Sequence, residues 1–292
     1  MHPAPSVILF TSLSGLGFGL FIWLGLGMPS VTGGTAFAFY FMAYALSVGG
    51  LLASTFHLAN RKNAIYAFSQ WRTSWLSREG ILAIVTLLAF APMAIAQIFF
   101  ASGSWNWIGP IGSALSVLTV FSTSMIYTQI KAIPRWNMPL TPVLFLLYAI
   151  SGGALLAGEA KVSGVLLIVL TALQIAAWMM GDGRFSGTGT TKGTATGLAP
   201  IGEVRLFESA HTARNYILDE MVHVVGRKHS QKLRTIATLL IGALPVALLL
   251  LLPAGHVVVF VALLSHVVGV FAARWLFFAE AEHVVGLYYA DR

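Results

Sequence analysis

Residues 81–100 read ILAIVTLLAFAPMAIAQIFF, a stretch of twenty positions without a charged side chain. A helix needs about 20 apolar residues to cross a bilayer, and a charge at the bilayer centre costs at least about 2.5 kcal/mol. The stretch therefore predicts a membrane-spanning helix. The whole chain has the same character, because 57% of its 292 residues are hydrophobic, 9% are charged and the mean hydropathy is +0.82. The composition predicts an all-α integral membrane protein and excludes an ordinary soluble domain.

Charge-free gaps define the other predicted spans. Arg61 is the first charged residue, and further long gaps run over 80–130, 136–158, 162–181 and 235–273. Turn signals at 28–34, 102–110 and 253–255 divide the gaps that are long enough for two helices. The prediction is an eight-transmembrane-helix bundle with spans at 6–27, 36–58, 79–100, 111–130, 140–158, 162–181, 235–252 and 257–279. The runs are apolar all round, whereas the strands of a transmembrane β-barrel alternate apolar and polar residues.

The basic residues are distributed asymmetrically across these spans. We call the side on which the first helix starts side A, and the opposite side is side B. Fifteen of the 17 Lys and Arg residues fall on side A, Lys161 falls on side B, and Arg274 lies within the last helix. The positive-inside rule makes side A cytoplasmic, so both termini are expected in the cytoplasm and the chain in the inner (cytoplasmic) membrane. The net charge of +7 then indicates contact with membrane lipid, with no nucleic acid partner.

The positions of the spans and of the charged residues divide the chain into three parts. Residues 1–181 hold helices 1–6, residues 182–234 form a cytoplasmic linker and interfacial segment, and residues 235–292 hold helices 7–8 and the C-terminal tail. The stretch GRFSGTGTTKGTATGLAP (183–200) is rich in Gly and Thr and is expected to be a flexible linker. It lacks the Gly-Lys-Ser/Thr ending of a phosphate-binding loop, so we do not expect it to bind nucleotide.

A polar cluster on side A joins the second and third predicted helices. His57 lies at the end of one, and Glu79 opens the next. An imidazole and a carboxylate at a hydrophobic–polar boundary suit a quinone site, because each quinone carbonyl needs a partner that can exchange protons. Trp71 and Trp75, four residues apart, would wall the headgroup pocket. The structural alternative is that His57 and Glu79 each interact with a helix dipole and that both Trp side chains anchor the protein at the interface.

Other polar residues in the spans favour structural roles. His266 lies in the last helix, but His256 lies near the opposite membrane surface, so the two do not form a bis-histidine haem site. We expect His266 to be a hydrogen-bonded packing residue. Gln97, Gln129 and Gln174 are expected to form interhelical hydrogen bonds rather than to line a transport path. The absence of cysteine excludes disulfides, thiolate zinc sites and cysteine-ligated iron–sulfur clusters built from this chain alone.

A second polar cluster covers residues 208–221. Glu208 and His211 have an i, i+3 spacing, but no second matched pair completes a ligand set, so we predict no metal site. The density of donors and acceptors favours docking of a partner protein on side A. The predicted docking residues are Arg61, Lys62, His211, Arg214 and Tyr216.

Three motifs together carry a family resemblance. They are His57-Leu58, the phrase RTSWLSRE (72–79), and HTARNY (211–216) followed by Glu220-Met221. With eight helices, these motifs resemble the membrane anchor subunit of the dimethyl sulfoxide reductase family over nearly the whole chain, and RTSWLSRE is the most specific part. The sequence departs from the family in having Ala59 where Gly is common and no proline between that position and Pro92.

The resemblance implies a subunit that anchors a molybdopterin catalytic subunit and a ferredoxin-like four-cluster iron–sulfur subunit. It implies binding of quinone, either ubiquinone or menaquinone, and no haem or iron–sulfur cluster in this chain. His57 and Glu79 match the family's quinol-site histidine and carboxylate, and the chain would carry no catalytic residue for the terminal substrate. The complete set of predicted quinone-binding residues is His57, Glu79, Trp71, Trp75, Arg72 and Arg78.

Because side A is expected to face the cytoplasm, the sequence favours one branch of that family. The chain looks most like the anchor of a cytoplasmic-facing sulfite-oxidising molybdoenzyme, which passes electrons into the quinone pool. The alternative within the family is the anchor of a quinol-dependent sulfoxide reductase. Two alternatives come from other classes: a haem-containing cytochrome subunit and a multi-pass transporter. A transporter would use inverted repeats and polar residues near the midplane, whereas the charges here lie at the edges of the spans.

Overall fold

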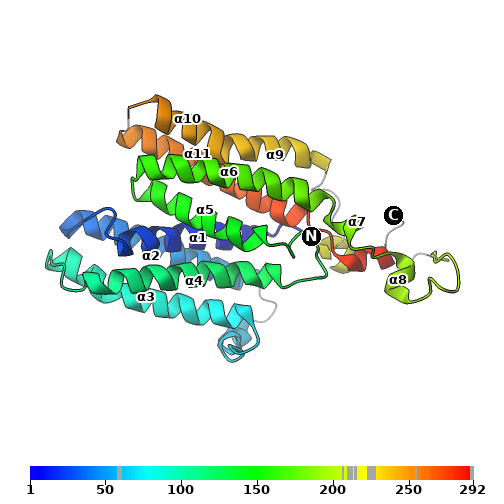
Figure 1. Cartoon of the computed structure of the whole chain (residues 1–292). Helices are drawn as coiled ribbons and strands as arrows, with labels where there is room; N and C mark the ends of the chain where they lie inside the picture. The colour runs from blue at the N-terminus through cyan, green and yellow to red at the C-terminus, as the bar shows by residue number, and fades with distance from the viewer. Residues whose placement is uncertain are drawn as a thin grey trace.

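The computed structural model describes residues 1–57, 61–205, 207–208, 213, 216–221, 228–253 and 255–289, without the side chains of residues 57 and 61–64. Long helices run side by side through this part of the chain (Figure 1). They are α1 (Pro5–Gly25), α2 (Gly33–Ser54), α3 (Trp75–Phe99), α4 (Gly109–Thr128), α5 (Leu140–Leu156), α6 (Ala160–Asp182) and α11 (His256–Ala279). One more span consists of α9 (Ser230–Thr238), the π-helical turn η6 (Leu239–Ala243) and α10 (Leu244–Leu251).

The length and composition of these helices confirm an integral membrane helical bundle. Seven spans in the described residues are long and apolar enough to cross a membrane, and α5 is the shorter apolar helix beside them. With 17 residues, α5 rises about 26 Å, slightly less than the hydrocarbon core of a typical bilayer. Each of the eight predicted spans coincides with one of these helical segments. That all eight cross the membrane stays a prediction.

Two helix boundaries near the predicted quinone site differ from the prediction. Helix α3 begins at Trp75 rather than at Glu79, because the Ser74 side chain caps its N-terminus and accepts a hydrogen bond from the Ser77 amide. Helix α2 ends at Ser54, four residues early, and the 3-10 turn η1 (Thr55–His57) follows it. A second 3-10 segment, η2 (Arg61–Phe68), then leads toward α3. Trp75 and Glu79 therefore lie one helical turn apart on the same face of α3.

Helix α1 forms the centre of the bundle and packs closely against α2, α4 and α5 (Figure 1). Its contact with α5 depends on glycine on both sides. A Cβ atom added to Gly19 would lie 1.9 Å from the carbonyl oxygen of Ala149, and one added to Gly153 would lie 2.2 Å from the backbone of Gly19. Small residues allow helix backbones in a membrane to approach in this way, where van der Waals packing replaces the hydrophobic effect.

Replacing Gly19 by Ala is expected to destabilise the bundle by about 1–3 kcal/mol, because α1 and α5 must move apart to admit the methyl group. Gly15→Ala is the matched control, since no atom lies within 4 Å of its added Cβ. Thermal unfolding of the two variants in the same detergent checks the prediction. Equal unfolding temperatures for both variants and the wild type would show that the close contact is not required.

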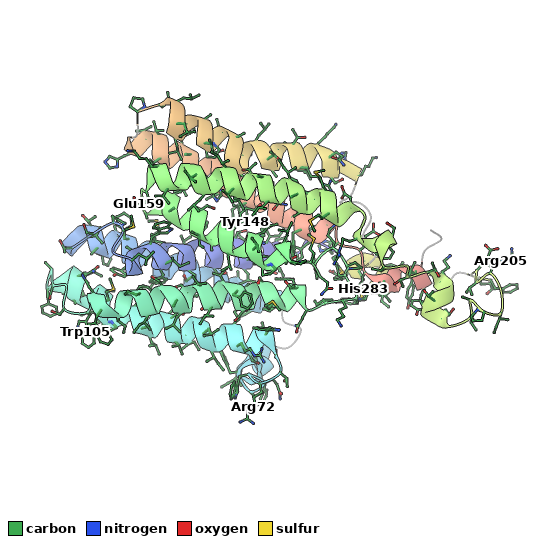
Figure 2. The ribbon with its side chains drawn as sticks, viewed as in Figure 1. Arg72, Trp105, Tyr148, Glu159, Arg205 and His283 are labelled. Atoms are coloured by element: carbon green, nitrogen blue, oxygen red, sulfur yellow. The ribbon has the colours of Figure 1, made fainter. Side chains whose placement is uncertain are left out.

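The N-terminus and the end of α11 meet on side A. The N-terminal amine of Met1 donates to the carbonyl of Ala281 at 2.6 Å, just beyond α11. The start of α1 and the end of α11 therefore share one end of the bundle, as an even number of crossings requires. Trp105 and Glu159 lie at the opposite end from His283 (Figure 2). Burial and the nearby N-terminal amine both lower the pKa of the His283 imidazole.

Short helices occupy the segment for which a flexible linker was expected. They are α7 (Arg184–Gly187) and α8 (Lys192–Thr196), which lie beyond the end of the bundle (Figure 1). Helix α8 forms because Thr191 and Thr194 cap its N-terminus reciprocally. The hydroxyl of Tyr288, in η7 (Val284–Tyr288), donates to the carbonyl of Ala195 at 2.9 Å. This bond connects α8 to the chain that follows α11.

The break in regular helical hydrogen bonding within the span 230–251 explains the role of His266. Pro245 has no N–H, so the carbonyl of Ile241 loses its usual i→i−4 donor. His266 Nδ1 lies 2.9 Å from that carbonyl oxygen and supplies the missing hydrogen bond, while the Ser265 hydroxyl donates to the carbonyl of Leu240 at 3.1 Å. The expectation that His266 is a hydrogen-bonded packing residue is confirmed.

The expected interhelical role of the glutamines holds for two of the three. Gln97 of α3 accepts a hydrogen bond from the Tyr40 hydroxyl of α2 at 3.1 Å. Gln174 of α6 accepts one from the Tyr148 hydroxyl of α5 at 2.9 Å. For Gln129 the expectation was wrong, because this residue is the C-cap that follows α4 and its amide donates to the carbonyl of Ile126 within that helix.

Candidate functional site

The most distinctive polar group within the spans is the carboxyl group of Glu79. It lies at the side-A end of α3 against α4, and only 3% of the residue is exposed. The hydroxyl of Thr123 in α4 donates to Glu79 Oε1 at 2.6 Å. No other side chain in the described part of the chain hydrogen bonds to Glu79. Its second oxygen, Oε2, is therefore available to a ligand or a proton.

Thr123 was not predicted from the sequence, although α4 carries a signal. Ser116, Thr119 and Thr123 recur at helical spacing and are all buried. Thr119 also contacts Thr86 of α3 through its hydroxyl at 3.2 Å. Buried hydroxyl residues at intervals of three and four mark the face of a helix that meets another helix in a membrane. This spacing of hydroxyl residues in the sequence is the signal that could have identified Thr123 as a partner of Glu79.

Trp75 and Arg78 form the edge of the site at the start of α3. The Trp75 ring packs edge-on against Phe121 of α4, with centroids 5.9 Å apart. The guanidinium carbon of Arg78 lies 4.4 Å above the Trp75 ring, at a cation–π distance. Arg78 also donates to the carbonyls of Trp71 at 2.9 Å and Arg72 at 2.6 Å. Arg78 thus holds the turn before α3 in place and fixes one face of Trp75.

The structure brings only part of the predicted quinone site together. Trp75, Arg78 and Glu79 share the first two turns of α3. Trp71 and Arg72 lie exposed on the preceding loop, with the guanidinium carbon of Arg72 5.3 Å from the centroid of the Trp71 ring. Figure 2 labels Arg72 on this loop.

Some of the predicted residues fall outside the described part of the chain. His57 closes η1, but its side chain is outside the described residues, so its pairing with Glu79 stays a prediction. Among the predicted docking residues, Tyr216 is exposed and precedes the π-helical turn η4 (Ile217–Met221). The side chains of Arg61 and Lys62, and residues His211 and Arg214 entirely, lie outside the described residues. Within the described residues, no group of three His, Asp or Glu side chains could hold a metal ion.

A network of four charged residues was missed in the sequence. Arg135 donates to Asp182 at 2.6 Å and to Glu280 at 3.2 Å. Arg234 donates to Glu280 at 2.7 Å and to both carboxylate oxygens of Asp182, at 2.6 and 2.8 Å. Each cation contacts both anions, and only Asp182 is substantially exposed.

This network joins segments that are far apart in the sequence. Arg135 comes from the α4–α5 loop, Asp182 ends α6, Arg234 lies in α9, and Glu280 follows α11. The ion pairs are mostly shielded from water, so screening weakens them little. They fasten the side-A ends of the later helices together.

Most of the chain is similar to one known family of membrane proteins. Residues 1–279, which end with α11, match the family model described as DMSO reductase anchor subunit (DmsC). The chain belongs to the DmsC family of anchor subunits. The family predicted from the three motifs is thus confirmed. Membership implies partner subunits in a multi-subunit reductase complex and a multi-pass location in a membrane.

One curated relative of this DmsC-family chain is a subunit of a sulfite dehydrogenase. The chain is 32% identical to a subunit of the sulfite dehydrogenase of Allochromatium vinosum, and the alignment covers 99% of each chain. No solved structure matches the chain.

Proposed function

We propose that this DmsC-family chain is the membrane anchor and quinone-reactive subunit of a molybdopterin oxidoreductase complex that oxidises sulfite. Its similarity to a sulfite dehydrogenase subunit over the full length supports the substrate. A ferredoxin-like four-cluster iron–sulfur subunit and the molybdopterin subunit would dock on side A, where the predicted topology puts fifteen of the 17 cations. All eight helices would cross the inner membrane, with both termini in the cytoplasm.

The buried carboxyl group of Glu79 is the observation that carries the quinone role. A bound quinone takes up two electrons and two protons and leaves as quinol. Glu79 fits such a ligand because Thr123 occupies Oε1 and leaves Oε2 able to hold or give a proton. The Trp75 ring, fixed by Arg78, offers an aromatic wall at the same end of α3. His57, at the end of η1, would serve the second carbonyl oxygen.

Gentle solubilisation of the tagged chain from its native membrane, followed by mass spectrometry of the co-purifying proteins, tests the anchor role. We expect a molybdoenzyme and a ferredoxin-like subunit, with molybdenum and iron measured in the same sample. The isolated complex should reduce quinone with sulfite as the electron donor. Quinol-dependent reduction of a sulfoxide without sulfite oxidation would support the other branch. Recovery of a metal-free chain under conditions that keep a known multi-subunit complex intact would contradict the anchor role.

A further inference from the structure

Arg274 is a buried cation that the proposed quinone site does not use. It lies in α11, only 4% exposed, and its guanidinium carbon is 3.7 Å above the Phe145 ring and 4.9 Å above the Tyr148 ring. The two rings position the guanidinium plane by cation–π contact. No carboxylate pairs with Arg274, and its guanidinium donates no hydrogen bond within the described residues. Its buried Nε is left without a partner.

A cavity adjoins this guanidinium. It lies between α5, α6 and α11, has a volume of about 40 Å³, and its polar lining includes Arg274, Arg135, Gln174 and Tyr148. The oxygen of the Gln174 amide accepts from Tyr148, so its NH₂ group can donate into the cavity. The lining of the cavity therefore includes hydrogen-bond donors from two helices, α6 and α11.

Charge is unbalanced around the cavity. Arg135 and Arg234 are neutralised by Asp182 and Glu280, and both Glu280 oxygens are already in use. Among the described residues of the cavity lining and this network, Arg274 adds a third guanidinium to two carboxylates, which leaves one positive charge. An uncompensated charge in a span is expensive, and such residues pair with an opposite charge or mark a ligand site.

We propose that this cavity binds the phosphate group of an anionic ligand, which is either a lipid headgroup or free phosphate. A planar guanidinium fork matches the oxygens of a phosphate with two parallel hydrogen bonds. The volume is enough for a small polar group. The proposed site is separate from Glu79 and does not depend on the proposed function.

Arg274 lies near the side-A end of its helix. It lies five residues before the end of α11, roughly 8 Å below the side-A end of the helix. Arg135 and Glu280 line both this cavity and a second one of about 230 Å³ near the side-A surface. A phosphate group could therefore approach from the headgroup region or from the cytoplasm. Basic pockets between helices on this side of a membrane typically hold anionic lipid headgroups.

Thermal unfolding of the delipidated full-length chain in a neutral detergent tests the proposal. Phosphatidylglycerol and sodium phosphate are added separately, with sodium chloride matched in ionic strength. At saturation, we expect at least one of the two to raise the wild-type unfolding temperature by about 2–4 °C. Arg274→Gln should lose that rise, and Arg274→Lys should need about tenfold more ligand because it lacks the fork. Lys131→Gln removes an exposed side-A cation and should keep the full rise.

The two ligands distinguish the sources. A rise with phosphatidylglycerol alone assigns a lipid headgroup, and native mass spectrometry should then show one lipid fewer on Arg274→Gln. A rise with millimolar sodium phosphate assigns the free anion. The proposal is overturned if neither ligand stabilises the wild type, if Arg274→Gln responds like the wild type, or if Lys131→Gln loses the response as well. If Arg274→Gln cannot be purified, the ligand requirement of Arg274→Lys decides.

Discussion

Replacing Glu79 by Gln is expected to lower quinone-linked turnover of the assembled complex by about 100-fold or more, the usual loss when a positioned acid–base group is removed. The amide keeps the shape of the side chain and can still accept from Thr123, but it cannot hold or release a proton. Turnover with an artificial electron acceptor should stay at the wild-type rate, because that reaction needs only the partner subunits. Both rates are measured on the same purified complex.

Two further variants separate proton chemistry from structure. Thr123→Val keeps the carboxyl group but removes the hydroxyl that fixes Oε1, and we expect a smaller loss of about tenfold in the quinone-linked rate. Glu159→Gln makes the same chemical change at the opposite end of the bundle and should leave both rates unchanged (Figure 2). Wild-type quinone turnover in Glu79→Gln would remove this carboxyl group from the site.

Replacing Glu280 by Gln is expected to destabilise the chain by about 3–5 kcal/mol, the cost of breaking a buried ion pair. Glu280 is 5% exposed and accepts from Arg135 and Arg234 at once. The neutral amide would leave two guanidinium groups close together with Asp182 as their remaining shared anion. Thermal unfolding of the purified chain in detergent, followed by near-ultraviolet circular dichroism, measures the loss.

Asp182→Asn is the matched comparison within the same network. Its carboxylate is 48% exposed, so water can solvate the arginines that it leaves, and a smaller loss is expected than for Glu280→Gln. The ranking of the two variants tests whether burial sets the strength of the network. Equal unfolding temperatures for Glu280→Gln and the wild type, or a larger loss in Asp182→Asn, would refute it.

The start of α3 shows how far the sequence could define the candidate site. Hydropathy placed a helix there, and the phrase RTSWLSRE selected Trp75, Arg78 and Glu79 together. The helix start was wrong by four residues because hydropathy does not detect the Ser74 cap. Thr123 was missed because its meeting with Glu79 depends on how α3 and α4 are rotated against each other.

The sequence and the tertiary structure determined different features of this protein. The sequence by itself determined a multi-pass helical membrane protein, the approximate spans and the family, because bilayer thickness and the cost of a buried charge act on each segment alone. Only the tertiary structure decided that Glu79 meets Thr123 and that Arg135 and Arg234 share two carboxylates. It also decided that Arg274 lies beside a cavity with no carboxylate partner in the described part of the chain. Spans that are apolar all round carry little periodic signal to fix which face meets which neighbour. That choice was made by close contacts such as Gly19 against Ala149, which exist only once the helices have assembled.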